Sequence, residues 1–125
     1  MKRIGFGILL FAGVSLVAIS CKKNQPAYKI EGDYSGNFEG NWQGNDTIIN
    51  TGFGVTVIAQ DKNKAKVSGK FFSEFEVLVT PNVINIELVS PTEGLTEFLY
   101  QGDTEKLTFK YENGGNVANY IGTKQ

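Results

Sequence analysis

Residues 28–42, YKIEGDYSGNFEGNW, alternate between two kinds of side chain over their whole length. The odd positions are polar or charged, whereas the even positions are aromatic, aliphatic or glycine. Successive side chains of a β-strand point to opposite faces, so this period of two predicts a strand with one apolar face. The glycines of that face predict bends or close approaches of backbone. The apolar face comprises Tyr28, Ile30, Gly32, Tyr34, Gly36, Phe38, Gly40 and Trp42.

The same alternation continues beyond residue 47, interrupted by turn residues at intervals of about ten. It predicts an all-β domain: an antiparallel meander of seven to eight short strands, preceded only by a signal-peptide helix. A small closed barrel is favoured over a β-sandwich, because closure removes exposed edges and the glycine-rich first strands favour coiling. The predicted turns are Gln43–Asp46, Asp61–Lys64, Thr80–Asn82, Ser90–Gly94, Gly102–Glu105 and Asn113–Asn116, the last requiring positive φ.

Two Gly-x-aromatic triplets, Gly32-Asp33-Tyr34 and Gly40-Asn41-Trp42, resemble the opening of the first strand in calycin barrels, which include lipocalins and avidins. In that group the triplet packs its aromatic ring at the closed end of the barrel. Tyr34 holds the matching position here, because Trp42 falls at the end of its strand. The resemblance implies a calycin-like barrel, and a fold of this kind does not fix a function.

The amino terminus carries the parts of a secretory signal. A basic start at residues 2–3 precedes an uncharged apolar run over 4–19, and AISC at 18–21 ends on the chain's sole cysteine, Cys21. This junction resembles the bacterial lipobox, which implies cleavage before Cys21 and attachment of lipid to its thiol. An uncleaved anchor is the first alternative, although 16 apolar residues fall short of the ~20 that span a bilayer. A secreted protein without lipid is the second alternative.

The predicted organisation is therefore a signal peptide over 1–20, a lipidated cysteine with a polar linker over 21–27, and the all-β domain over 28–125. Lipid would hold the domain at a membrane of the bacterial cell envelope. Lys22 follows the cysteine, in place of the aspartate that retains enteric lipoproteins at the inner membrane. That analogy favours the outer membrane and leaves the choice between its two faces open.

Composition narrows the function classes. Without Lys2 and Arg3, the 12 basic residues fall to 10 lysines against 13 acidic residues, a net charge of −3. A mildly acidic chain without arginine lacks the dense basic face that nucleic-acid binding requires. Histidine is absent and the cysteine is assigned to the lipid, so neither a conventional catalytic triad nor a zinc site is expected. We expect no enzyme activity, no metal and no cofactor.

Several side chains are candidates for chemistry or binding. Carboxylates such as Glu39 and Glu74 are expected on a solvated outer face, and the acidic turns are expected to be ordinary turns and not calcium sites. Trp42, at a strand end, is expected to be partly exposed and to bind a partner. Phe72 and Leu78 fall on the outward register of their strand, where they would form an exposed apolar patch for a partner.

These observations favour a lipid-anchored envelope protein whose domain is a non-enzymatic module that binds another protein. Binding of a small ligand or carbohydrate in a calycin-like barrel is one alternative, and a purely structural envelope role is another. An eight-stranded barrel interior holds either side chains or one small ligand. The many inward aromatic residues favour a filled interior.

Overall fold

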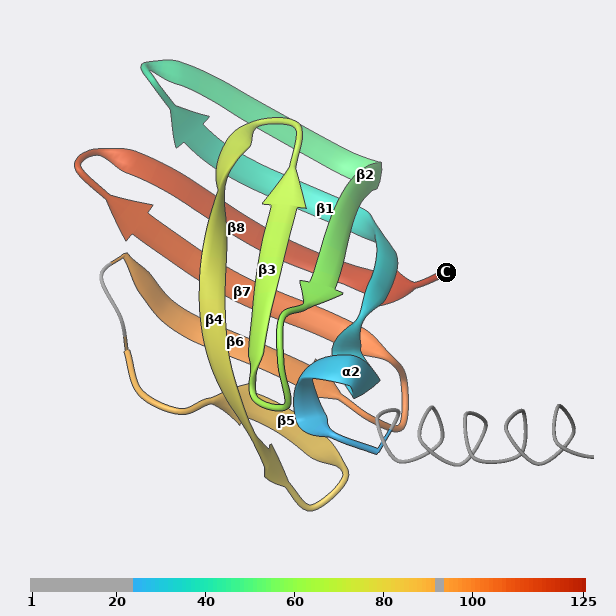
Figure 1. The fold of residues 1–125 in the computed structure, drawn as a ribbon. Coiled ribbons are helices and arrows are strands. Elements are labelled where there is room, and N and C mark those ends of the chain that lie inside the picture. Colours follow the sequence, from blue (N-terminus) through green and yellow to red (C-terminus); the bar gives the residue numbers. More distant parts are fainter. Residues whose placement is uncertain (1–23, 92–93) are drawn as a thin grey trace, which may run out of the picture.

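The computed structural model describes residues 24–91 and 94–125, which form a closed antiparallel barrel of eight strands in sequence order (Figure 1). Each strand pairs with the next along the chain, and β8 pairs with β1 to close the barrel. The all-β prediction and the preference for a barrel are confirmed. The strands are β1 Gly32–Trp42, β2 Asn45–Ala59, β3 Lys64–Gly69, β4 Phe72–Asn82, β5 Asn85–Leu88, β6 Leu95–Gln101, β7 Lys106–Asn113 and β8 Asn116–Lys124.

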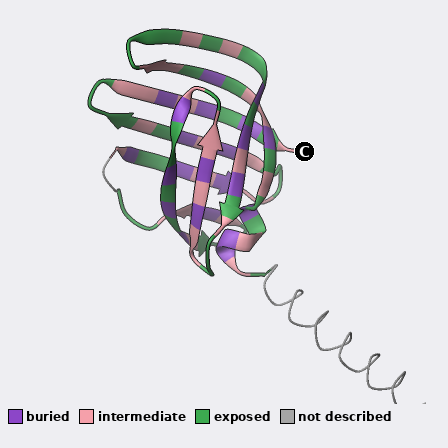
Figure 2. Ribbon diagram, turned by 45° about the horizontal axis from the view of Figure 1, so that its top comes forward, coloured by how far each residue is buried: buried purple, intermediate pink, exposed green. Residues whose placement is uncertain are grey.

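Burial alternates along the strands as the sequence period predicts, which Figure 2 shows as bands of buried and exposed residues. In β1, Tyr34 and Phe38 are buried while Asp33, Asn37 and Glu39 are exposed. The barrel interior is thus built from one face of every strand. The exposed carboxylate of Glu39 is on the outer face, as expected.

The glycines of β1 allow two backbones to approach closely. A Cβ on Gly36 would overlap the backbone of Ile121 and Gly122 in β8, and a Cβ on Gly40 would overlap the carbonyl oxygen of Val117. No other residue fits at these positions without a shift of β8. Their sequence positions therefore fix where the barrel closes.

Two tight turns at the end of the barrel that lies away from residue 24 have central residues with positive φ (Figure 1). Gln43 and Gly44 have φ of 51° and 82° between β1 and β2. Gly114 and Gly115 have φ of 59° and 84° between β7 and β8, as the turn prediction requires. Two central residues with positive φ match the right-handed twist of the flanking strands.

The structure corrects the beginning of the domain. Pro26–Ile30 forms a short helix, α2, where the alternation predicts the first strand from Tyr28, and β1 begins only at Gly32. Pro26 and Ala27, the last two residues of the predicted linker over 21–27, are buried in this helix. A single helical turn is too short to display a helical period, although proline at its start is a common helix signal. The predicted signal peptide and Cys21 fall on residues 1–23, outside the described part.

Helix α2 covers one end of the barrel (Figure 1). The amide of Ala27 donates to the carbonyl oxygen of Lys62 in the β2–β3 turn at 3.0 Å. The ammonium of Lys124 in β8 donates to the carbonyl oxygen of Lys29 at 3.0 Å. We call this the capped end and the opposite end the mouth. Within residues 24–91 and 94–125, no helix has the length and apolar character needed to cross a membrane.

Candidate functional site

The barrel interior is filled with side chains. Phe38 stacks on Phe53 with ring centroids 4.4 Å apart, and Phe75 meets Phe109 edge-on at 5.3 Å. All buried side chains of the described residues are apolar or tyrosine, and none of their polar atoms lacks a hydrogen-bond partner. An interior packed in this way leaves a ligand to bind at the ends or on the outer face.

Tyr34 joins the interior to the capped end. Its ring is 1% exposed and meets Tyr100 edge-on at 6.4 Å, and its hydroxyl donates to the carbonyl oxygen of Ile30 at 2.5 Å. Burial, with the nearby Tyr100 phenol, raises the pKa of Tyr34 well above its ordinary value. Burial also raises the pKa of Tyr120 to about 12, and its hydroxyl donates to the carbonyl oxygen of Phe53 at 3.0 Å. These phenols are structural donors held in their neutral form.

At the mouth, the β1–β2 and β3–β4 hairpins enclose a notch of about 410 Å³. Its walls combine aromatic rings, amide and hydroxyl groups and a single cation, with no carboxylate. The β1–β2 hairpin contributes Trp42, Asn45 and Thr47, and the β3–β4 hairpin contributes Lys70, Phe71 and Phe72. Such a surface suits an occupant with an apolar side chain and a negative charge.

Trp42 lies between this notch and the packed core. Its ring centroid is 5.7 Å from that of Tyr111 and 6.4 Å from that of Phe72, and the residue is partly buried. The hairpin that carries it is braced by Asn41, whose amide donates to the carboxylate of Asp46 at 2.7 Å. Trp42 is therefore held in a defined position with part of its ring open, and the expectation of partial exposure is confirmed.

Beside the notch, β2 presents a backbone edge that no strand of the described residues pairs with. Strand β2 pairs with β1 from Asn45, but its pairing with β3 covers only Val55–Ala59. Hydrogen-bond directions alternate along an antiparallel pair, and a two-residue turn begins with a bonded pair, here Trp42 with Asn45. The backbone groups of Asp46 and Ile48 therefore point away from β1. We call Asn45–Gly54 the free edge.

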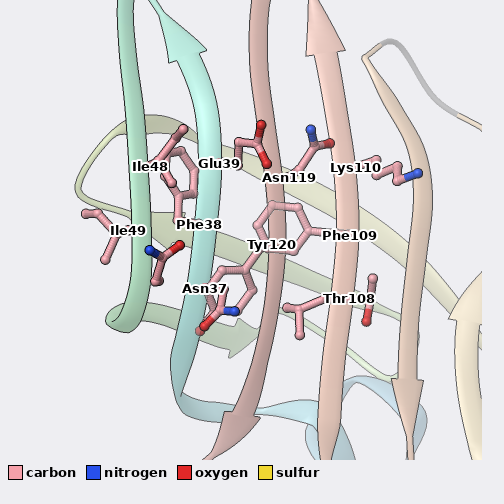
Figure 3. Close-up of a pocket in the computed structure, with 12 residues that line it drawn as sticks. Asn37, Phe38, Glu39, Ile48, Ile49, Thr108, Phe109, Lys110, Asn119 and Tyr120 are labelled. Atoms are coloured by element: carbon pink, nitrogen blue, oxygen red, sulfur yellow. The ribbon is translucent and has the colours of Figure 1, made fainter.

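A second, smaller hollow of about 240 Å³ lies on the outer face of β1, β2, β7 and β8 (Figure 3). Ile48 and Ile121, 68% and 46% exposed, provide its apolar parts. Polar groups of Glu39, Asn119 and Lys110 surround them. The Lys110 ammonium is 3.5 Å from the carboxylate of Glu97, so the cation of this hollow is already paired.

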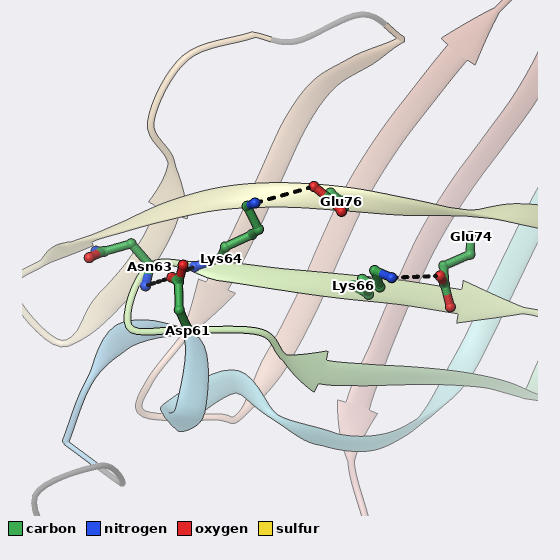
Figure 4. A network of polar contacts seen from close by, with 6 residues as sticks. All are labelled: Asp61, Asn63, Lys64, Lys66, Glu74 and Glu76. Atoms are coloured by element: carbon green, nitrogen blue, oxygen red, sulfur yellow. Dashed lines mark hydrogen bonds and ion pairs between the residues drawn. The ribbon is translucent and has the colours of Figure 1, made fainter.

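The carboxylates of β4 form ion pairs on the outer face of the barrel. Lys64 pairs with Glu76 at 3.7 Å and Lys66 pairs with Glu74 at 3.6 Å across β3 and β4, and all four side chains are substantially exposed (Figure 4). Exposed pairs of this kind contribute little to stability. Within the described part of the chain, no group of three or more potential metal ligands is assembled.

The acidic turn before β3 has ordinary turn chemistry. The carboxylate of Asp61 accepts hydrogen bonds from the amides of Asn63 at 3.0 Å and Lys64 at 3.1 Å (Figure 4). The side-chain amide of Asn63 in turn donates to the carbonyl oxygen of Val79 at 3.0 Å. The turn oxygen atoms thus satisfy the backbone of the turn itself, as expected.

The predicted patch of Phe72 and Leu78 does not form. Leu78 is outward and 43% exposed, as predicted, but Phe72 is 6% exposed and packs inside the mouth. The cause is a bulge between β3 and β4, where Val67 pairs with Phe75 but Gly69 pairs with Phe72. The extra residue leaves Ser73 and Glu74 both exposed and turns Phe72 inward. The free edge of β2 was not foreseen, because strand lengths and pairing partners are not encoded in the period of two.

The fold and its mouth define a class: a small, side-chain-filled antiparallel barrel with one helix-capped end and one aromatic end. No family model, curated protein or solved structure matches the chain.

Proposed function

We propose that this protein is a lipid-anchored bacterial envelope protein whose barrel is a non-enzymatic module that binds a protein partner at the mouth. The observation that carries the proposal is the free edge of β2 beside the notch around Trp42. Exposed strand edges accept an extended segment as an additional strand, and adjacent pockets receive its alternate side chains. We therefore expect the partner to supply an extended segment.

The side chains that line the notch indicate which residues the partner's extended segment should carry. Trp42, Phe71 and Phe72 suit a large apolar side chain, and Lys70 is the lone charge in the walls. The Lys70 ammonium is 5.4 Å from the ring centroid of Phe71, so its charge lies beside an aromatic wall of the notch. An apolar residue followed by a carboxylate is the pattern that complements this arrangement.

The position of the mouth agrees with anchoring. Helix α2, where the described chain begins, lies at the capped end, and the turns around Gln43 and Gly114 lie at the other end (Figure 1). Lipid on Cys21 would hold the capped end near the membrane. The mouth would then be directed away from the membrane, where a partner can approach.

Site-specific photo-crosslinking in cells that produce the full-length protein tests the proposal. A photoreactive residue at Thr47, in the notch, should give a covalent adduct with another protein, and the Trp42→Ala substitution should remove that adduct. The matched control is the same residue at Lys62, exposed at the capped end. Equal adducts at Thr47 and Lys62, or an adduct that persists in Trp42→Ala, would contradict the proposal.

A small ligand is the second candidate, because 410 Å³ lies in the size range of small-molecule pockets. Aromatic rings with amide groups are also found where carbohydrates bind. Protein adducts at Thr47 would be absent in that case. Emission of Trp42, the single tryptophan of the chain, would instead shift on addition of a soluble glycan.

A further inference from the structure

The β4–β5 turn at the capped end carries an exposed apolar tip. Val83 is 93% exposed and Ile84 is 52% exposed, and these two residues connect Asn82 to Asn85. No other large apolar side chain of the described residues is exposed to the extent of Val83. Two neighbouring apolar residues at a hairpin tip are an unusual choice in water, where glycine, asparagine and aspartate are preferred.

The backbone at this tip is strained as well. Val83 has a φ of 58°, in the left-handed region that β-branched residues rarely adopt. The other two non-glycine residues with positive φ in the described chain, Gln43 and Glu105, are unbranched and polar. Glycine would relieve the strain at position 83, so valine costs stability there. Strain at an exposed residue that the core does not use points to a task outside the fold.

The tip shares an end of the barrel with the entry point of the chain. Figure 1 shows the β4–β5 turn at the same end as α2, opposite the hairpins of the mouth. The tip is held there, because the amide of Gly102 in the β6–β7 turn donates to the side chain of Asn85 at 3.2 Å. The described chain begins at this end with α2, and the sequence before it contains the apolar run and Cys21.

We propose that the Val83–Ile84 tip inserts into the lipid interface of the membrane that anchors the protein. This inference rests on the proposed lipid anchor. The two side chains enter the boundary between headgroups and acyl chains, where the burial of apolar surface is favourable. Together with the lipid on Cys21, the tip is a second membrane contact that fixes the orientation of the barrel. The capped end then faces the membrane and the mouth faces away from it.

The test uses the full-length lipidated protein reconstituted in vesicles of phosphatidylethanolamine and phosphatidylglycerol. An environment-sensitive fluorophore is attached to a cysteine introduced as Ile84→Cys, and the control carries it at Gln43→Cys in the mouth. We expect the label at 84 to show blue-shifted emission and quenching by spin-labelled lipids, and the label at 43 to show neither. Flotation of the vesicles measures anchoring separately.

A second variant separates membrane contact from folding. Val83→Gly removes the apolar side chain and the strain together, so it should raise Tm by about 4 °C or more while it reduces lipid quenching of the label at 84. Ile121→Asn removes an exposed isoleucine from the outer face. It should change neither the emission of the label at 84 nor its quenching by spin-labelled lipids.

Each result bears on the proposal. A protein that floats with vesicles while the label at 84 remains in water would overturn the tip insertion and leave the anchor intact. A protein that does not float would overturn both, since the tip then fails to hold it. A label at 84 that is shielded without vesicles would show that a protein surface covers the tip, and it would also overturn the inference.

Discussion

The hydroxyl of Tyr34 donates a hydrogen bond of 2.5 Å to the carbonyl oxygen of Ile30, four residues earlier in the chain. This bond ties the beginning of β1 to α2 and closes the capped end around a fully buried ring. Ile30 is itself buried, so water could not hydrogen-bond to its carbonyl oxygen if the Tyr34 hydroxyl were removed. The hydroxyl of Tyr34 therefore contributes directly to the stability with which α2 is attached to β1.

Tyr34→Phe should lower the free energy of unfolding by about 1–3 kcal/mol, because it leaves the buried carbonyl of Ile30 without a donor. A drop in Tm of several degrees in circular dichroism melts would show it. Tyr111→Phe is the matched control, because its hydroxyl only accepts a long bond from Asn113 at 3.4 Å on the exposed side. Equal effects of the two substitutions would contradict the assigned role of Tyr34.

Two glycines of neighbouring strands should respond in opposite ways to alanine. Gly36→Ala forces a Cβ into the backbone of Ile121 and should cost at least about 2 kcal/mol. Gly54→Ala meets nothing closer than 4.0 Å and has no positive φ, so it should be neutral or slightly stabilising. Urea unfolding of both variants checks the pair. Tolerance of alanine at 36 would mean that β1 and β8 are farther apart than described.

Stability should fall as the pH rises above about 10. Unfolded tyrosine ionises near its ordinary pKa of 10.0, whereas burial raises the pKa of Tyr120 to about 12 and that of Tyr34 further. Above pH 10 the folded state therefore holds more protons than the unfolded state, and stability falls by up to ~1.4 kcal/mol per pH unit for each such phenol. Urea melts between pH 8 and 12 measure the slope, and Tyr120→Phe should reduce it.

Phe72 and Leu78 on β4 should differ sharply when truncated to alanine. Phe72 is buried among aromatic rings, so Phe72→Ala should lower the free energy of unfolding by about 3–5 kcal/mol. Leu78 is 43% exposed, so Leu78→Ala should lower it by less than about 1 kcal/mol. Thermal melts of the two variants give the comparison. Similar costs would favour the unbulged register, in which both residues point outward.

Cys21→Ser should abolish acylation and the membrane attachment that depends on it. A serine hydroxyl does not replace the thiol that receives lipid in bacterial lipoproteins, so the variant should appear in the soluble fraction or as an uncleaved precursor that keeps its apolar run. Its intact mass should lack the acyl chains found in the wild type. A variant that still partitions with membranes, with no acyl difference from the wild type, would refute lipidation at Cys21.

The sequence predicted the parts of the fold that depend on local chemistry. The alternation around Tyr34 and Phe38 identified β1 and its inner face, and the glycine pair 114–115 located a hairpin with positive φ. It was wrong where pairing between strands decides the outcome. The bulge that turns Phe72 inward depends on how β4 aligns with β3, and a period of two does not contain that information.

The candidate site was predicted only in part, for the same reason. Trp42 was identified because tryptophan at a strand end combines apolar area with a polar tip. The notch beside it arises because β3 begins its pairing with β2 only at Val55, a consequence of relative strand length. The strain at Val83 appears only in a backbone dihedral, and valine itself gives no sign of it.

The order of the strands has a consequence for how the chain folds as it is synthesised. Each strand of the described barrel pairs with its neighbour in sequence, and closure alone joins distant segments, with Tyr34 opposite Lys124. During vectorial synthesis, hairpins can form one after another, but the second edge of β1 stays uncovered until β8 has been made. The partly folded chain is therefore an open barrel whose first strand has an unpaired edge. The rate of the last docking step, and not of hairpin formation, would then govern how much of the protein aggregates.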